Sequence, residues 1–253
     1  MNWWGKLIGT GIGMFGGPVG AIAGAALGHL YDEDDPTPKD ERKARILYLT
    51  YFFSCAAKVA KADGSISAEE ISATESLITR MGLNEKTGEF AKNVFRKAKT
   101  SRRPIHEDFK EVGQMIGYEP TVAQSFLGGL FEIVRSNGQK LNEIQVRFLL
   151  LGEERLKLPA GTISSWIRGG YAPPQQDPAA DGLSLEEAYD VLGLARDCSN
   201  AGLKKSYHGK AADFHPDKLR SKNLPDEFVC FANDQLAKIN QAYDIICEAR
   251  GLK

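Results

Sequence analysis

Apolar residues recur every three or four positions along most of this chain, the spacing that gives an α-helix one buried face. The pattern holds over residues 46–59, 71–83 and 122–134, and it returns near the carboxyl end over residues 203–214 and 228–246. No isolated stretch alternates apolar and polar residues in the way that is typical of a half-buried strand. We therefore predict an all-α fold.

The most apolar stretch lies near the amino terminus. Residues 7–31 contain no Asp, Glu, Lys or Arg, and as a helix rising about 1.5 Å per residue they exceed the roughly 30 Å hydrocarbon core of a bilayer. Trp3 and Trp4 precede this run, where aromatic side chains favour the membrane interface. We predict a single transmembrane helix at 7–31, after a short non-cytoplasmic tail at 1–6.

Glycines at helical spacing mark one side of this predicted span. Such residues leave the backbone bare, so that a second helix can pack closely against it. The glycines concerned are Gly13, Gly17, Gly20 and Gly24. We predict a homodimer through this face.

Two other interpretations of the apolar stretch remain open. One is a cleaved signal peptide with an exit at Ala21-Ile22-Ala23, although its start carries only Lys6. The other is a glycine-rich tail or a helix lying on a surface, because glycine and Pro18 make insertion less favourable. A third, a buried soluble helix, is disfavoured because glycine weakens helices in water.

Charge predicts the orientation of the span. The residues that follow it carry four basic side chains, Lys39, Arg42, Lys43 and Arg45, whereas only Lys6 and the terminal amine precede it. The positive-inside rule then places the chain after residue 31 in the cytoplasm.

Residues 40–168 are predicted to form a helical middle domain with a faint internal repeat. In each copy a glycine turn leads into a helix that starts with a capping box, a cap residue followed three positions later by Glu or Gln. The pairs are Ser67 with Glu70, and Asn142 with Gln145. We predict a capped helix–turn–helix at each place.

The first of these turns also imitates the end of a calcium-binding loop. In that register Val59 and Lys61 would occupy two ligand positions, and neither side chain can ligate calcium. The duplicated turn resembles the TerB-like helical domain, some members of which are associated with tellurite resistance and metal binding. Only Asp63, Glu69 and Glu70 match such a role, and the second copy has Asn137 in place of the first of them. We assign no metal.

A linker rich in proline and glycine at 169–182 separates the middle domain from a carboxy-terminal domain at 183–253. In this last domain an amphipathic helix runs toward Phe214 and ends there, because Pro216 disfavours helical geometry in the residue before it. His215 and Asp217 are then presented on an exposed turn.

Four short segments in this domain resemble the J-domain of DnaJ-family co-chaperones. They are Tyr189-Asp190-Val191-Leu192-Gly193-Leu194, Leu203-Lys204-Lys205-Ser206-Tyr207, His215-Pro216-Asp217-Lys218 and Lys238-Ile239-Asn240-Gln241-Ala242-Tyr243. The order of the whole chain, with a tail, a span, a TerB-like domain, a linker and a J-domain, resembles the DjlA type of membrane-anchored bacterial co-chaperone.

This resemblance implies a function. Such a protein stimulates ATP hydrolysis by a DnaK-type chaperone without being an enzyme itself, and it needs no cofactor. The residues implied in chaperone binding are His215, Pro216, Asp217, Lys218, Lys204, Lys205 and Tyr207. The implied location is the bacterial inner membrane, in a single pass, with membrane lipid as a further partner.

The chain departs from the family pattern on the helix before the turn, where the family commonly has basic residues. His208, Gly209 and Asp213 stand there instead. A second hypothesis is therefore a membrane-tethered helical adaptor, or a metal- or stress-related TerB-like protein, with a degenerate J-domain. A third, an enzyme that uses His215 and Asp217 as an acid–base pair, lacks a nucleophile and a phosphate-binding loop.

Charge and cysteine content bear on nucleic-acid binding and on the redox compartment of the protein. The net charge of −1 gives no overall field that would favour nucleic acid. The four cysteines, Cys55, Cys198, Cys230 and Cys247, form no CxxC pair, so we predict free thiols in a reducing compartment. The basic segment 96–103 is either a helix end favoured by its dipole or a contact for anionic lipid.

Overall fold

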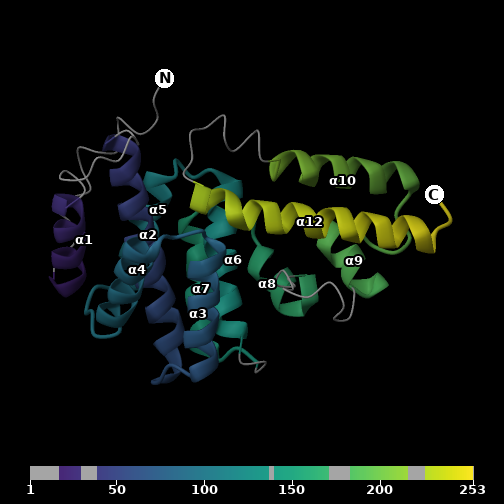
Figure 1. Ribbon diagram of the computed structural model, residues 1–253. Coiled ribbons are helices and arrows are strands. Elements are labelled where there is room, and N and C mark those ends of the chain that lie inside the picture. The colour runs from purple at the N-terminus through teal and green to yellow at the C-terminus, as the bar shows by residue number, and fades with distance from the viewer. Residues whose placement is uncertain (1–16, 30–38, 137–139, 171–182, 216–225, 253) are drawn as a thin grey trace. The chain divides into compact units, whose positions relative to one another are not determined.

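The computed structural model describes residues 17–29, 39–136, 140–170, 183–215 and 226–252 (Figure 1). Every regular element in these ranges is a helix, which confirms the predicted all-α fold. The chain divides into two compact units, Met1–Leu158 and Pro159–Lys253.

The first unit is built around two helices, α2 and α6, whose side chains are largely buried. The helices α4, α5, α6 and α7 all contact α2. The elements of this unit are α1 (Gly17–His29), α2 (Lys39–Ala60), η2 (Lys61–Asp63), α3 (Ala68–Arg80), α4 (Glu85–Ala98), α5 (Ile105–Met115), α6 (Pro120–Arg135) and α7 (Glu143–Arg155).

Aromatic rings from α2, α5 and α6 form the centre of this core. Phe126 of α6 meets Phe52 edge-on at 5.4 Å between ring centroids and Tyr48 at 5.7 Å. Phe109 of α5 approaches Phe126 at 6.4 Å. Edge-to-face contacts at these distances add to the hydrophobic burial of the rings, so the three helices are held against one another at one point.

Both capping boxes predicted in this unit are confirmed. The Ser67 hydroxyl accepts the Glu70 N–H at 3.1 Å, and the Glu70 carboxylate accepts the Ser67 N–H at 2.9 Å. Asn142 and Gln145 make the same pair of bonds at 2.8 and 3.1 Å. Each box satisfies two N–H groups that a helix start otherwise leaves without a partner.

The predicted transmembrane helix at 7–31 is not confirmed by the structure. The helix found there, α1, has 13 residues and begins at Gly17, and among the described residues no helix is long and apolar enough to cross a membrane. Residues 1–16 and 30–31, with Gly13, lie outside the described residues.

A buried charged group joins α2 to α5 in the first unit. The side chain of Asp108 is fully buried and forms ion pairs with Lys58 and with Arg103, whose Nε lies 2.6 Å from Asp108 Oδ1. The Ser54 hydroxyl donates to Asp108 Oδ2 at 3.0 Å.

These contacts shift the pKa values of two neighbouring groups. Burial by itself lowers the pKa of the Arg103 guanidinium, but the hydrogen bond and charge of Asp108 outweigh burial and raise it. The pKa of the neighbouring Cys55 thiol is raised, first by burial and then by the Asp108 charge.

The basic segment 96–103 has mixed surroundings. Arg103 pairs with the buried Asp108, Arg96 reaches Glu89 at 3.2 Å, and the Lys99 ammonium lies 5.5 Å from the ring centre of Phe95. Three of its basic side chains are thus held by groups of the same unit.

The second unit contains α8 (Thr162–Ser165), η3 (Trp166–Gly170), α9 (Leu185–Leu192), α10 (Asn200–Asp213) and α12 (Asp226–Ala249). α10 and α12 form a hairpin, and α9 packs against both (Figure 1). Buried apolar side chains from all three helices fill the space between them: Ala188, Leu192, Leu203, Ile239, Ala242 and Ile246.

The three cysteines whose side chains the structure describes, Cys55, Cys198 and Cys247, form no disulfide. Cys230 belongs to α12, but its side chain is outside the described part.

Candidate functional site

The end of α10 presents the residue at which the predicted chaperone-binding turn begins. α10 stops at Asp213, and the N–H of the next residue, Phe214, still reaches the Lys210 carbonyl at 3.2 Å. The side chain of Phe214 is buried, whereas that of His215 is exposed. The apolar residue therefore anchors the helix end to the core while the following residue faces solvent. Residues 216–218, the rest of the predicted turn, lie outside the described residues.

The solvent side of α10 carries the two lysines assigned to chaperone binding. Lys204 and Lys205 are exposed, and so are His208 and Gly209 one turn later. A β-carbon added at Gly209 would meet nothing within 4 Å. The helix therefore has room for a longer side chain where the family commonly has a basic one.

Tyr207, also assigned to chaperone binding, lies between α10 and α12. Its ring stacks on Tyr243 of α12, with centroids 4.0 Å apart and planes 17° apart, and its hydroxyl donates to the Asn240 side chain at 3.1 Å. The half-buried ring thus fixes the rotation of α10 against α12. Lys204 and Lys205 remain exposed on the same helix.

Sequence analysis missed the residue that ties the base of the hairpin together, Arg250. Its guanidinium donates to the Tyr189 hydroxyl at 2.7 Å and to the carbonyls of Cys198 at 2.8 Å and Arg196 at 2.9 Å. The hydrogen bond to Tyr189 is the largest cause that raises the pKa of this group. Arg250 belongs to no motif and its partners lie more than 50 residues away, so nothing in the sequence could have indicated it.

The start of α9 is stabilised by hydrogen bonds between Ser184 and Glu187. The first residues of α9 form a capping box: the Ser184 hydroxyl accepts from the Glu187 N–H at 3.3 Å, and the Glu187 carboxylate accepts from the Ser184 N–H at 2.9 Å. The hydrogen bonds that the Ser184 N–H and the Ser184 hydroxyl donate to this carboxylate lower the pKa of the Glu187 carboxyl. Their contribution to stability is therefore full above the unfolded-state pKa and is lost as the pH falls through the folded-state pKa.

Together these contacts form a rigid three-helix support with an exposed residue at the end of one helix. No group of three or more His, Cys, Asp and Glu that could hold a metal occurs among the residues that the structure describes. The site exposes the imidazole of His215 and the positive charges of Lys204 and Lys205.

Comparison with known proteins matches three family models along the chain. Residues 1–46 match the transmembrane domain of the co-chaperone DjlA, residues 51–144 match the tellurite resistance protein TerB, and residues 187–250 match the DnaJ domain. The first match supports a membrane-anchored protein.

Curated relatives are similar over the whole chain. Co-chaperone protein DjlA of Photobacterium profundum is 28% identical, with 99% of this chain and 100% of the relative covered. The proteins of the same name from Coxiella burnetii and Escherichia coli are 28% and 25% identical, and both chains are covered completely. No solved structure gives a significant match. The three domains in this order, with similarity along the full length of these relatives, support a DjlA-type J-domain co-chaperone.

Proposed function

We propose that this chain stimulates ATP hydrolysis by a DnaK-type chaperone, through the turn that begins at His215 and through the exposed lysines of α10. The observation that carries the proposal is the end of α10, where buried Phe214 is followed at once by exposed His215. A partner can reach this residue without unfolding any part of the hairpin.

The chain acts by binding and performs no chemistry of its own in this proposal. His215 offers a directional hydrogen bond, and Asp217 offers a carboxylate to an arginine of the chaperone, an interaction stronger than a bond between neutral groups. Lys204 and Lys205 attract an acidic surface and orient the encounter. The chaperone supplies the ATP and the catalytic groups.

We place the chain at the inner membrane because of its apolar amino-terminal stretch and the basic residues that follow this stretch. The basic residues after the apolar stretch favour a single pass with the two described units on the cytoplasmic side. There the J-domain meets a chaperone that uses ATP.

The proposed activity is tested by adding the full chain, in an uncharged detergent, to a DnaK-type chaperone from the same cell. We expect stimulation that saturates with the amount of chain and weakens as salt rises, because exposed lysines are screened. Absence of stimulation at low salt, with binding retained, would instead favour the adaptor hypothesis.

The departures from the family pattern give a quantitative prediction. Gly209→Lys combined with Asp213→Lys adds three positive charges and raises helix propensity by up to about 1 kcal/mol. We expect the Kd for the chaperone to fall roughly three- to tenfold at low salt, and the gain to shrink at high salt. Surface plasmon resonance against the ATP-bound chaperone measures it.

A matched control adds the same charge elsewhere on the domain. Glu248→Lys with Ala249→Lys changes two exposed residues near the end of α12 and should leave the Kd within about twofold. An equal gain in both variants would show that net charge alone, and not the face of α10, governs binding.

We also propose that the apolar amino-terminal stretch forms the contact of a homodimer. Leucine at Gly13, Gly17, Gly20 and Gly24 should strengthen insertion, because leucine partitions into lipid better than glycine, but it should hold the two backbones apart. We expect firmer membrane association together with at least a severalfold smaller crosslinked dimer fraction. An unchanged dimer fraction in membranes would contradict the glycine contact.

A further inference from the structure

One row of exposed residues runs along α10 from the lysines assigned to chaperone binding toward the turn at His215. Its members, Lys204, His208 and Ala212, are four residues apart, and residues at that spacing lie one above the other on a helix. All three are exposed, and so is Lys205, three residues before His208. His208 thus occupies the middle of the surface between the lysines and the end of the helix.

A partner that contacts both ends of this row must also cover its middle. The helix rises only about 14 Å from Lys204 to its last residue, Asp213, whereas a standard interface buries about 800 Å² on each partner, a patch roughly 30 Å across. The proposed function places Lys204, Lys205 and His215 in one such contact. A chaperone bound in this way therefore lies over His208 as well.

On α10 itself the charges on the side of His208 are positive. Lys204 and Lys205 lie one turn before it, and the only acidic residue of this helix, Asp213, lies five residues after it. Five residues correspond to about 140° around the helix axis, so Asp213 is on a different side. A proton on His208 therefore adds to an existing positive surface.

Among the described residues, the helices packed against α10 bring no carboxylate into an ion pair with His208. Toward α12, its ring lies 5.1 Å from that of Tyr207, which stacks on the residue that precedes the exposed Asp244. α9 packs on the other side of α10, where the Ser206 hydroxyl donates to the Leu192 carbonyl at 2.7 Å. Because two residues are about 200° apart on a helix, the acidic side chains of α9 do not face His208.

We propose that His208 is a contact residue of the chaperone-docking surface and that its protonation tightens docking. Histidine gains a positive charge between about pH 8 and pH 5, so the row carries two charges at the upper end of this range and three at the lower end. An acidic partner surface is attracted more strongly by the third charge, and docking tightens as the pH falls. The inference rests on the proposed function, because it needs a chaperone that contacts both the lysines and the turn.

The test measures the Kd of the full chain, in an uncharged detergent, for the ATP-bound chaperone at about pH 7.5 and about pH 6.0. Other histidines and the chaperone itself change charge over this range, and they do so alike for every variant. The informative quantity is therefore the Kd of His208→Gln divided by that of the wild type at the same pH. We expect this ratio to be close to one at the higher pH and about two- to fivefold at the lower pH.

Two further variants separate charge from other effects of the substitution. His208→Lys carries its charge at both pH values, so it should bind about two- to fivefold more tightly than the wild type at the higher pH and nearly as the wild type does at the lower pH. His106→Gln makes the same chemical change at an exposed histidine of α5, in the first unit. It should keep the wild-type Kd at both pH values.

A ratio near one for His208→Gln at both pH values would overturn the inference, and so would an equal change in His106→Gln. His208→Lys that binds no more tightly than the wild type at the higher pH would show that no acidic surface covers this position. Stimulation of ATP hydrolysis by the wild-type chain is measured on the same samples. If stimulation is present while the ratio stays near one, the inference fails and the proposed function stands; if stimulation is absent, both fail.

Discussion

His215→Gln in the full chain is expected to abolish stimulation of the chaperone's ATP hydrolysis. The exposed imidazole adds little to the core, whereas loss of a bond that aligns the partner costs about 1.5–3 kcal/mol, or roughly ten- to a hundredfold in the stimulated rate. The rate is measured with chaperone, ATP and saturating chain. Far-ultraviolet circular dichroism of the variant should match that of the wild-type chain.

His208→Gln is the matched control for this experiment. His208 is an exposed histidine of α10, the helix that ends just before His215, and its replacement makes the same chemical change. We expect this variant to keep at least about half of the stimulation. Near-wild-type stimulation by His215→Gln, or equal losses in the two variants, would contradict a specific role for the turn.

Asp108→Ala is expected to give the largest loss of stability in the first unit. The substitution leaves Lys58 and Arg103 facing a buried site without the carboxylate that both contact. Breaking a buried ion pair from one side costs about 3–5 kcal/mol, because the remaining charge stays desolvated. Hydrogen exchange followed by mass spectrometry should show faster exchange in α2 and α5, while α12 keeps its protection.

Glu107→Ala provides the control, since this neighbouring carboxylate lies 3.5 Å from Arg103 but is half exposed. It should cost no more than about 0.5 kcal/mol. Replacing Lys58 and Arg103 by Met in addition to Asp108→Ala removes the stranded charges and should recover part of the lost protection. If Asp108→Ala exchanges no faster than Glu107→Ala, the network is not a significant source of stability.

The parts of this structure that sequence analysis predicted well are local. A capping box joins residues three positions apart, so Ser67, Asn142 and Ser184 could each be recognised from the residues that follow them. The same holds for the end of α10, because Pro216 acts on the residue beside it. The predicted caps at Ser67 and Asn142 are confirmed, Ser184 caps α9 in the same way, and the described part of the chain is helical throughout its regular elements.

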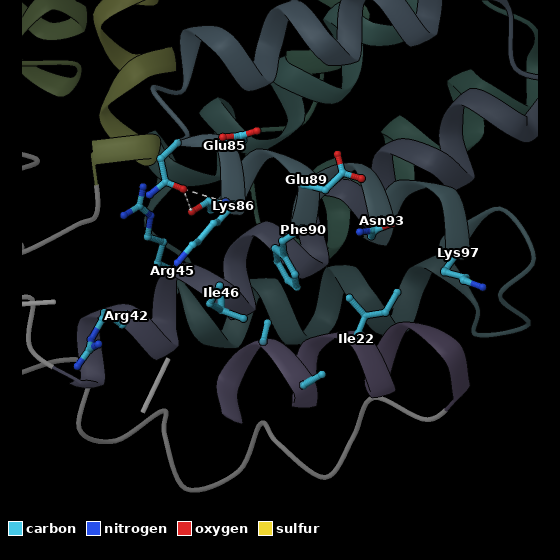
Figure 2. A pocket seen from close by; sticks show the side chains of 14 residues that line it. Ile22, Arg42, Arg45, Ile46, Glu85, Lys86, Glu89, Phe90, Asn93 and Lys97 are labelled. Carbon is cyan, nitrogen blue, oxygen red and sulfur yellow. Dashed lines mark hydrogen bonds between the residues drawn. The ribbon is translucent and has the colours of Figure 1, made fainter. Parts of the chain in front are cut away.

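The parts that were missed depend on residues far apart in sequence. Asp108 lies 50 residues from Lys58, and Arg250 lies 61 from Tyr189. Each pair meets only after two helices have packed, and neither leaves a periodic pattern. The cavity of about 910 Å³ between α1, α2 and α4 likewise forms only where three helices meet (Figure 2). The apolar stretch at 7–31 was evident from the sequence, and the part of it that the structure describes, residues 17–29, is helical.

Single-turnover ATP hydrolysis by the DnaK-type chaperone tests the central claim most directly. The chaperone is loaded with one ATP, and hydrolysis is followed after adding either the full chain or a chain that ends at residue 168 and so lacks the J-domain. We predict that the full chain accelerates hydrolysis at least about tenfold and that the shortened chain leaves it at the basal rate. Equal rates with the two chains would contradict the assignment of this protein as a chaperone-stimulating J-domain protein.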